Sequence, residues 1–316
     1  MIDHGMLDVG DGHQVYWEVC GNPDGRPAVV VHGGPGSGAG AFWRDFFDLS
    51  TYKVVLFDQR NCGRSTPDAG DDEVDLSTNT TAHLVADMEQ LRHQLGIEQW
   101  LVLGASWGAT LGLAYAEQHP SAVSEIVLFS VTNTTAREVE WITREMGRVF
   151  PDEWRRFRDG VPEGERDGNL ALAYSRLLHD PDPAVRDRAA RDRAARNWCD
   201  WEDTHVATHG AGIQPSKRYA DPRFRLRFAR LVSHYWGHAG FLEDGVLERE
   251  AGKLAGIPGV LVVGRLDFSS PVEAAWKMTQ RWPDAELKIV EDAGHGAGST
   301  SVSDLVKQAV ARFAER

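Results

Sequence analysis

Short apolar runs alternate with turn-forming and helical segments over the first 130 residues of the chain. The runs Met6–Val9 and Gln14–Val19 flank Gly10-Asp11-Gly12, a pattern typical of a β-hairpin. Later runs are apolar at almost every position, which indicates strands of a parallel sheet that is covered on both faces. They are Ala28–His32, Val54–Asp58, Trp100–Leu103 and Ile126–Phe129.

Helical spacing separates these runs, and the same alternation returns near the end of the chain. Apolar residues recur at three- and four-residue spacing in Thr80–Leu95, and Ala109–His119 is followed by the helix-breaking Pro120. From residue 251 onward we expect strands at Val260–Val263 and Leu287–Val290, and helices near Pro271–Arg281 and from about Ser303. An antiparallel start followed by alternating strands and helices predicts an α/β fold with a mostly parallel sheet and helices on both faces.

Residues 131–250 differ in composition from the flanking segments. They are rich in Arg, Asp and Trp, follow helical spacing and contain no convincing buried strand. We therefore predict a helical cap inserted between two strands of the sheet, with residues 1–130 and 251–316 forming the core. A length of 316 residues suits one large core that carries such an insertion.

The charge balance changes the expected class of partner. With 34 Lys+Arg against 47 Asp+Glu, the net charge of −13 repels phosphate, so nucleic acid and anionic membranes are not expected partners, whereas a cationic substrate would be attracted. Three scattered cysteines, Cys20, Cys62 and Cys199, fit neither a disulfide framework nor a zinc site. No signal peptide is recognisable at the N-terminus, so we expect a cytoplasmic protein. The sequence leaves the oligomeric state open.

The sharpest chemical signal is Gly104-Ala105-Ser106-Trp107-Gly108, which lies between an apolar strand and an Ala/Leu-rich helix. A Gly-x-Ser-x-Gly sequence in that context predicts a nucleophile elbow, a turn so tight that neighbouring side chains must be small. The helix N-terminus favours negative charge that develops at the serine. Ser106 is therefore the candidate nucleophile.

A serine hydroxyl needs a base to remove its proton, and the base needs a carboxylate to orient it. Asp267 follows the strand Val260–Val263, and His295 follows the strand Leu287–Val290, so both lie where open α/β sheets bind ligands. We prefer Asp267 to its rival Asp292, since Asp292 is only three residues from His295 and is better placed to shape that turn.

The tetrahedral intermediate of acyl transfer also needs hydrogen-bond donors for its oxyanion. After the strand Ala28–His32, the sequence Gly33-Gly34-Pro35-Gly36 lets backbone N–H groups approach a substrate oxygen. We assign the oxyanion hole to the N–H groups of Gly34 and Trp107. His32 is expected to hold this loop by hydrogen bonding rather than to act as a second base.

Together these residues resemble the α/β-hydrolase superfamily and, more narrowly, the prolyl aminopeptidase (proline iminopeptidase) family. The motifs are His32-Gly-Gly-Pro-Gly36, Asp58-Gln-Arg-Asn-Cys-Gly-Arg-Ser65, Gly104-Ala-Ser-Trp-Gly-Ala-Thr-Leu111, Gly264-Arg-Leu-Asp267 and Gly294-His295. The resemblance implies an eight-stranded sheet with a lid, and release of an N-terminal residue, typically proline, from a peptide. The family's catalytic residues correspond to Ser106, Asp267 and His295, and neither a metal nor an organic cofactor is implied.

The same resemblance implies where the free amine of a substrate binds. Cap glutamates bind the ammonium in this family, and Trp198-Cys-Asp-Trp-Glu202 matches its Trp-x-x-Trp-Glu pattern, so Glu202 is the first choice. Many relatives carry a second glutamate where this chain has Val232. Glu243 or Asp244 are the candidates to replace it, and we take Glu243 as the second amine-binding residue.

Three alternatives remain open beside a serine aminopeptidase acting on proline or another small residue. The first is an aminoacyl-amide hydrolase that removes an amino-acid group from a non-peptide metabolite, motivated by the altered second-glutamate region. The second is a carboxylesterase or lactonase of the same fold, which would not need Glu202. The third is a ligand-binding module on a hydrolase scaffold. Cys62 is not expected to be the nucleophile, since no second histidine is placed to activate it.

Overall fold

The computed structural model describes residues 1–316 except 72, 180–187, 210–211, 214, 299 and 316. The strands of its large sheet are β1 (Asp3–Asp8), β2 (Gln14–Gly21), β3 (Arg26–Val31), β4 (Tyr52–Phe57), β5 (Trp100–Ala105), β6 (Val123–Phe129), β9 (Gly259–Gly264) and β10 (Ala285–Val290). They form an eight-stranded sheet in the order β1-β2-β4-β3-β5-β6-β9-β10. β2 pairs antiparallel with β1 and β4, and the other pairings are parallel, so the expected mostly parallel sheet is confirmed.

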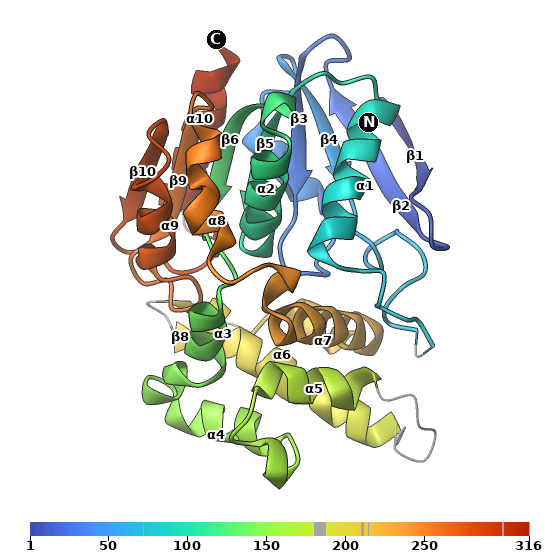
Figure 1. Cartoon of the computed structure of the whole chain (residues 1–316), viewed down its shortest axis with the longest axis vertical. Helices are drawn as coiled ribbons and strands as arrows, with labels where there is room; N and C mark the ends of the chain where they lie inside the picture. The colour runs from blue at the N-terminus through green and yellow to red at the C-terminus, as the bar shows by residue number, and fades with distance from the viewer. Residues whose placement is uncertain (72, 180–187, 210–211, 214, 299, 316) are drawn as a thin grey trace.

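Helices cover both faces of this sheet because successive side chains of each strand point to opposite sides. In β3, Val29 and Val31 join a buried cluster with α1 (Thr81–Gln94), α2 (Trp107–Gln118) and α9 (Val272–Thr279). Ala28 and Val30 join the opposite cluster with α10 (Thr300–Ala314) and the 3-10 helix η1 (Ala41–Phe46). Figure 1 shows α1 and α2 in front of the sheet. The nearly continuous apolar runs thus reflect burial on both faces, as predicted.

The segment between β6 and β9 is mainly helical and lies across one end of the sheet (Figure 1). Its helices are α3 (Ala136–Thr143), α4 (Pro151–Asp159), α5 (Leu170–His179), α6 (Arg188–Val206), α7 (Pro222–Gly237) and α8 (Val246–Glu250). β7 (Thr208–His209) and β8 (Gly212–Ile213) pair only with each other in the described part of the chain. The remaining 3-10 helices are η2 (Pro120–Ala122), η3 (Glu145–Arg148), η4 (Glu163–Glu165), η5 (Lys217–Ala220), η6 (Ala239–Phe241) and η7 (Ala251–Leu254).

Most of this segment has a hydrophobic core of its own. Phe157 stacks on Tyr174 and Trp201 with ring centroids 4.8 and 5.4 Å apart, and Trp198 meets both Phe157 and Tyr174 edge-on. Leu247 of α8, in contrast, packs in the core cluster beneath α2. The boundary predicted at residue 250 rests on a change in composition along the sequence, and it stays a prediction.

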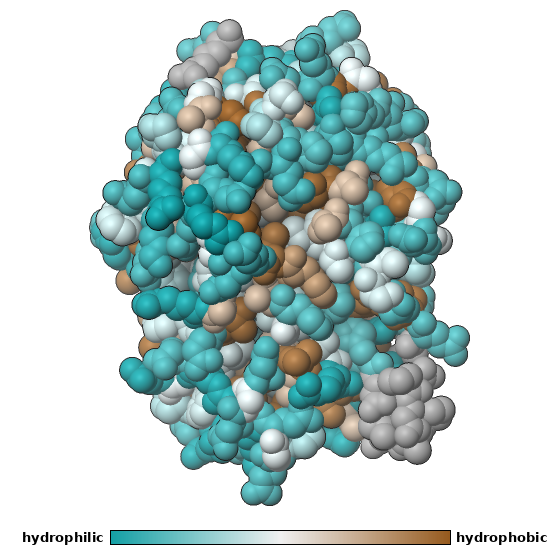
Figure 2. Space-filling model, viewed as in Figure 1, coloured by the Kyte–Doolittle hydropathy of each residue, from teal (hydrophilic) through white to brown (hydrophobic). Residues whose placement is uncertain are grey.

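The surface is largely polar. Figure 2 shows a mainly hydrophilic face on which apolar residues occur in small groups. Among the described residues, no helix is long and apolar enough to cross a lipid bilayer.

Glu117 of α2 is a buried carboxyl far along the helix from Ser106. Its Oε1 has no hydrogen-bond partner among the described residues. Burial, with the nearby charge of Glu250, raises its pKa from 4.5 to about 8. In the unfolded chain the carboxyl ionises at its ordinary pKa, so the native state becomes progressively less stable as pH rises from that value to about 8.

We therefore expect Glu117→Gln to stabilise the protein by roughly 2–4 kcal/mol at about pH 9 and to change little at about pH 4. Urea unfolding at both pH values measures the difference, with the exposed Glu98→Gln as the matched control. An equal gain at both pH values would contradict this account of Glu117.

Candidate active site

The turn between β5 and α2 holds Ser106 in a strained backbone conformation. Its φ of 55° and ψ of −125° are rarely adopted by residues other than glycine. The packing around the turn requires glycine, because a Cβ on Gly108 would lie 2.0 Å from the carbonyl oxygen of Val31. A Cβ on Gly104 would lie 2.4 Å from the carbonyl oxygen of Gly108. Ser106 is the N-cap residue of α2, and the predicted elbow is present.

Asp267 and His295 meet because β9 and β10 are parallel neighbours whose carboxyl ends lie side by side. His295 Nδ1 lies 2.9 Å from Oδ2 and 3.1 Å from Oδ1 of Asp267. The backbone N–H of Ser270 donates to Oδ1 at 2.8 Å, which fixes the carboxylate. Asp292, the rival acid, is exposed.

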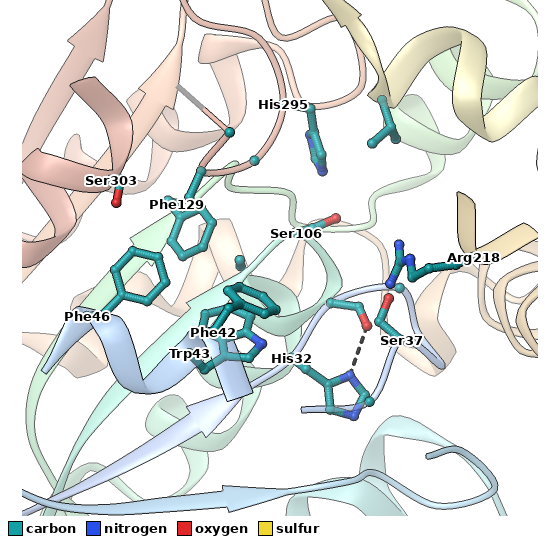
Figure 3. A pocket seen from close by; sticks show the side chains of 18 of the residues that line it. His32, Ser37, Phe42, Trp43, Phe46, Ser106, Phe129, Arg218, His295 and Ser303 are labelled. Carbon is teal, nitrogen blue, oxygen red and sulfur yellow. Dashed lines mark hydrogen bonds between the residues drawn. The ribbon is translucent and has the colours of Figure 1, made fainter. Parts of the chain in front are cut away.

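Asp267 also helps to raise the pKa of His295. Burial alone would lower the pKa of this imidazole, but the neighbouring carboxylates of Asp267 and Glu202 outweigh it and raise the pKa. The loop is held by the N–H of Gly296, which donates to Ser130 Oγ at 2.7 Å. In Figure 3 the His295 ring faces Ser106 across the cavity. With Nδ1 bound to Asp267, Nε2 is the nitrogen available to take a proton.

A cavity of about 500 Å³ lies between the sheet and the cap, and both Ser106 and His295 line it. Glu202, Arg218 and Tyr219 contribute the cap side, and Phe42, Phe46 and Phe129 make part of an apolar wall on the core side. Among the described residues, no group of three or more His, Cys, Asp or Glu side chains is placed to hold a metal ion.

The predicted oxyanion loop borders this cavity through Gly33 and Gly34. His32 is fully buried, and its Nε2 accepts the backbone N–H of Gln59 at 3.1 Å. Gln59 also donates from Nε2 to the carbonyl of His32 at 2.9 Å and accepts from Trp107 Nε1 at 3.0 Å. His32 thus holds the loop, as predicted.

Gln59 therefore links the two segments that carry the candidate oxyanion donors, Gly34 and Trp107. No motif pointed to this role of Gln59, although the residue lies two positions after the end of the buried strand β4, at the edge where ligand sites form. The neighbouring Asp58 accepts the N–H groups of Ala39 and Arg64 at 2.7 and 2.9 Å. The Asp58–Ser65 motif is thus a support for the loop rather than part of the cavity wall.

Contrary to the expectation from the sequence, a second histidine lies beside Cys62, since His32 Nε2 is 3.6 Å from the sulfur. That nitrogen already accepts the N–H of Gln59, and burial raises the pKa of the Cys62 thiol well above its usual range. A buried, protonated thiol is a poor nucleophile.

Glu202 extends from α6 into the cavity. Trp198 and Trp201 pack inside the cap, whereas the Glu202 side chain is 15% exposed and lines the site. Burial raises its pKa to about 7, against the opposing effect of His295. His205 lies alongside, with Nε2 3.7 Å from Glu202 Oε2 and Nδ1 3.2 Å from Ser269 Oγ. Because burial lowers the pKa of His205 to about 3, this imidazole is neutral near pH 7.

The structure does not bring Glu243 to the site. Its side chain is 75% exposed and pairs with Arg249 at 3.1 Å. Asp244 accepts the backbone N–H of Ala136 at 2.7 Å, and neither acid lines the cavity. Val232, at the position of the family's second glutamate, is buried in the cap. The assignment of Glu243 as an amine-binding residue is therefore not supported by its position.

Arg218 and Tyr219 are lining residues that the sequence did not reveal. Both lie on η5, a single turn with no apolar periodicity and no motif. Only the folding of the cap brings this turn over the core, so no local pattern could have indicated it.

Comparison with known proteins agrees with this fold. A family model described as the alpha/beta hydrolase fold matches residues 27–300. A Streptomyces coelicolor protein named "Probable proline iminopeptidase" is 53% identical over 302 residues, covering 94% of this chain and 91% of the relative. A "Proline iminopeptidase" from Xylella fastidiosa is 43% identical over 298 residues, covering 94% and 91%.

Among solved structures, a proline iminopeptidase from Mycobacterium smegmatis has a TM-score of 0.64 at 20% identity, covering 99% of this chain and 98% of that one. At this identity the match supports the fold alone. The sequence matches go further, because they extend over nearly the whole chain. The chain therefore belongs to the α/β-hydrolase fold family and, within it, to the family of the proline iminopeptidases.

Proposed function

We propose that this protein is a serine aminopeptidase that releases an N-terminal residue, proline above all, from small peptides or aminoacyl amides. The observation that carries the proposal is one cavity lined by Ser106, His295 and the largely buried carboxyl of Glu202. A nucleophile with its base, next to a carboxylate with little access to water, suits an acyl substrate that has a free ammonium beside its scissile bond.

In the proposed acylation step, Ser106 Oγ attacks the carbonyl carbon of the N-terminal residue while His295 Nε2 takes the hydroxyl proton. The oxyanion of the tetrahedral intermediate accepts the N–H groups of Gly34 and Trp107. His295 then gives its proton to the leaving amine as the C–N bond breaks. Water, activated in turn by His295, hydrolyses the acyl-enzyme and releases the amino acid.

Asp267 and Glu202 have separate tasks in this proposal. Asp267 orients His295 through Nδ1 and stabilises the imidazolium that forms. Glu202 pairs with the substrate ammonium, so that the scissile carbonyl is placed at Ser106. Residues 131–250, as a cap, exclude water from that ion pair.

The largely buried Glu202 favours an amine-dependent enzyme over a carboxylesterase or lactonase, which gains nothing from a carboxylate there. An aminoacyl-amide hydrolase acting on a metabolite would share the whole mechanism and differ only in the leaving group. A cytoplasmic location is part of the proposal and is supported by Cys20, Cys62 and Cys199, which are free and buried.

Replacing the proposed nucleophile is the first test. Ser106→Ala should lower kcat/KM for proline p-nitroanilide by about 10⁴-fold or more and abolish labelling by a fluorophosphonate probe. Ser303→Ala, which alters another hydroxyl of the cavity wall, should keep the labelling. Equal labelling of wild type and Ser106→Ala would contradict the assignment.

Glu202→Gln tests amine recognition. We expect kcat/KM for proline anilide to fall roughly 100-fold, because the bound ammonium would lose its charged partner. Activity on an N-acylated anilide, which we expect to be low in wild type, should change little in this variant. Glu243→Gln is the matched control and should behave like wild type; a large loss in that variant would revive the sequence-based assignment of Glu243.

The pH dependence of kcat/KM should show the ionisations of both His295 and Glu202. The proposed active form needs neutral His295 and ionised Glu202, so kcat/KM should fall as pH drops through about 7, the pKa of Glu202. Since the charge of Glu202 helps to raise the pKa of His295, removing it in Glu202→Gln should shift the acid limb of the residual activity to lower pH. A shift to higher pH in a pH–rate profile would show that the two groups are not coupled in this way.

A further inference from the structure

Besides the imidazoles of His32 and His295, an arginine and a lysine line the cavity, and the proposed reaction uses neither of these two cations. Arg218 comes from η5 of the cap, and Lys307 comes from α10 of the core. The chain has a net charge of −13, and the proposed substrate carries a positive amine. A cation in the cavity would repel that amine, so its presence requires another explanation. Figure 3 shows the Arg218 side chain extending toward Ser106 from the cap side of the cavity.

The turn that carries Arg218 is anchored to the cap by polar contacts. Asp203 Oδ1 accepts the backbone N–H of Ser216 at 2.9 Å, and Ser216 Oγ accepts from Arg218 Nε at 3.3 Å. The carbonyl of Tyr219 accepts from Arg225 at 2.7 Å. Asp203 directly follows Glu202, so one end of α6 both directs Glu202 into the cavity and fixes the turn that bears Arg218.

The guanidinium keeps donor capacity for a ligand. Among the described residues, Arg218 forms no ion pair with a carboxylate, and its contacts are Ser216 Oγ and the ring of Phe224, 5.1 Å from the guanidinium carbon. Arg218 is an exposed residue, whereas the Glu202 side chain is only 15% exposed. A substrate lying between them would meet a carboxylate at its inner end and a guanidinium at its outer end.

We propose that Arg218 binds the C-terminal carboxylate of a short peptide substrate, so that the enzyme prefers dipeptides with a free C-terminus. This inference rests on the proposed function and specifies its substrate class. A dipeptide is a zwitterion whose two charges are separated by about two residues, roughly 7 Å when extended. Glu202 would hold its ammonium, and the planar guanidinium would hold its carboxylate, the group that Arg pairs with best.

Arg218 fits this role better than Lys307. Lys307 lies on α10, which packs on η1, and Asp45 of η1 also lines the cavity, so a carboxylate bound on that side would meet an acid as well as the lysine. Lysine in addition offers a point charge rather than two parallel donors.

The test compares prolyl-glycine with prolyl-glycinamide, which differ only in the terminal carboxylate, and adds proline p-nitroanilide as a substrate without one. Wild type should prefer the free acid to the amide by about tenfold in kcat/KM, chiefly through KM, as expected for a partly exposed charge-assisted pair. In Arg218→Gln this preference should fall to about one, with a much smaller change on the anilide.

Two matched variants separate Arg218 from general electrostatics. Lys217→Gln removes the adjacent positive charge on the same turn, and Lys307→Gln removes the other cation of the cavity; both should keep the preference for the free acid. The inference is overturned if wild type shows no such preference, if Arg218→Gln retains it, if Lys307→Gln abolishes it, or if Arg218→Gln loses all three substrates in proportion. If wild type releases proline from none of the three substrates, the proposed function itself is contradicted.

Discussion

The close approach of helix α2 to strands β3 and β5 is the constraint on which the site depends. The backbone of Gly108 touches the carbonyl of Val31, so no side chain fits between helix and sheet at that point. This contact holds Ser106 in its strained conformation at the start of α2. It also places the turn against the loop after β3, because a Cβ on Gly33 would lie 2.9 Å from the carbonyl of Ala105. The candidate nucleophile and the candidate oxyanion loop are therefore positioned by two neighbouring close contacts.

The charges around this turn influence one another. Glu202 and Asp267 both raise the pKa of His295, and burial raises the pKa of Glu202. The Glu202 carboxyl, whose pKa is about 7, and the His295 imidazole therefore influence each other's charge. A bound ammonium would cancel the charge of Glu202 and so lower the pKa of His295, which makes the imidazole a more available base when a substrate is present. Amine binding and proton transfer are then linked through electrostatics alone, with no change in the fold.

Patterns in the sequence predicted the sheet and the reacting groups for physical reasons. Strands buried on both faces must be apolar throughout, so their runs identified β3 to β6 and β9. The tight turn at Ser106 requires glycine on either side, and parallel strands bring their carboxyl ends together, which placed Asp267 and His295. The predicted starts of β3 and β6 came too late, because polar residues such as Arg26 and Glu125, which hydrogen-bond to each other, also belong to these strands. The predicted ends of β3 and β4, at His32 and Asp58, lie one residue beyond the observed ends.

The sequence by itself determined which groups stand at the carboxyl ends of the strands, since local composition and chain direction fix that position. Tertiary structure alone decided which cap residues reach them. Glu243 and Arg218 are both charged residues of the cap without distinctive surroundings in sequence, yet one lies on the outer surface and the other lines the cavity. Their positions follow from how α6, α7 and η5 pack on one another and on the core, and such packing joins residues too far apart in the chain for any local pattern to record.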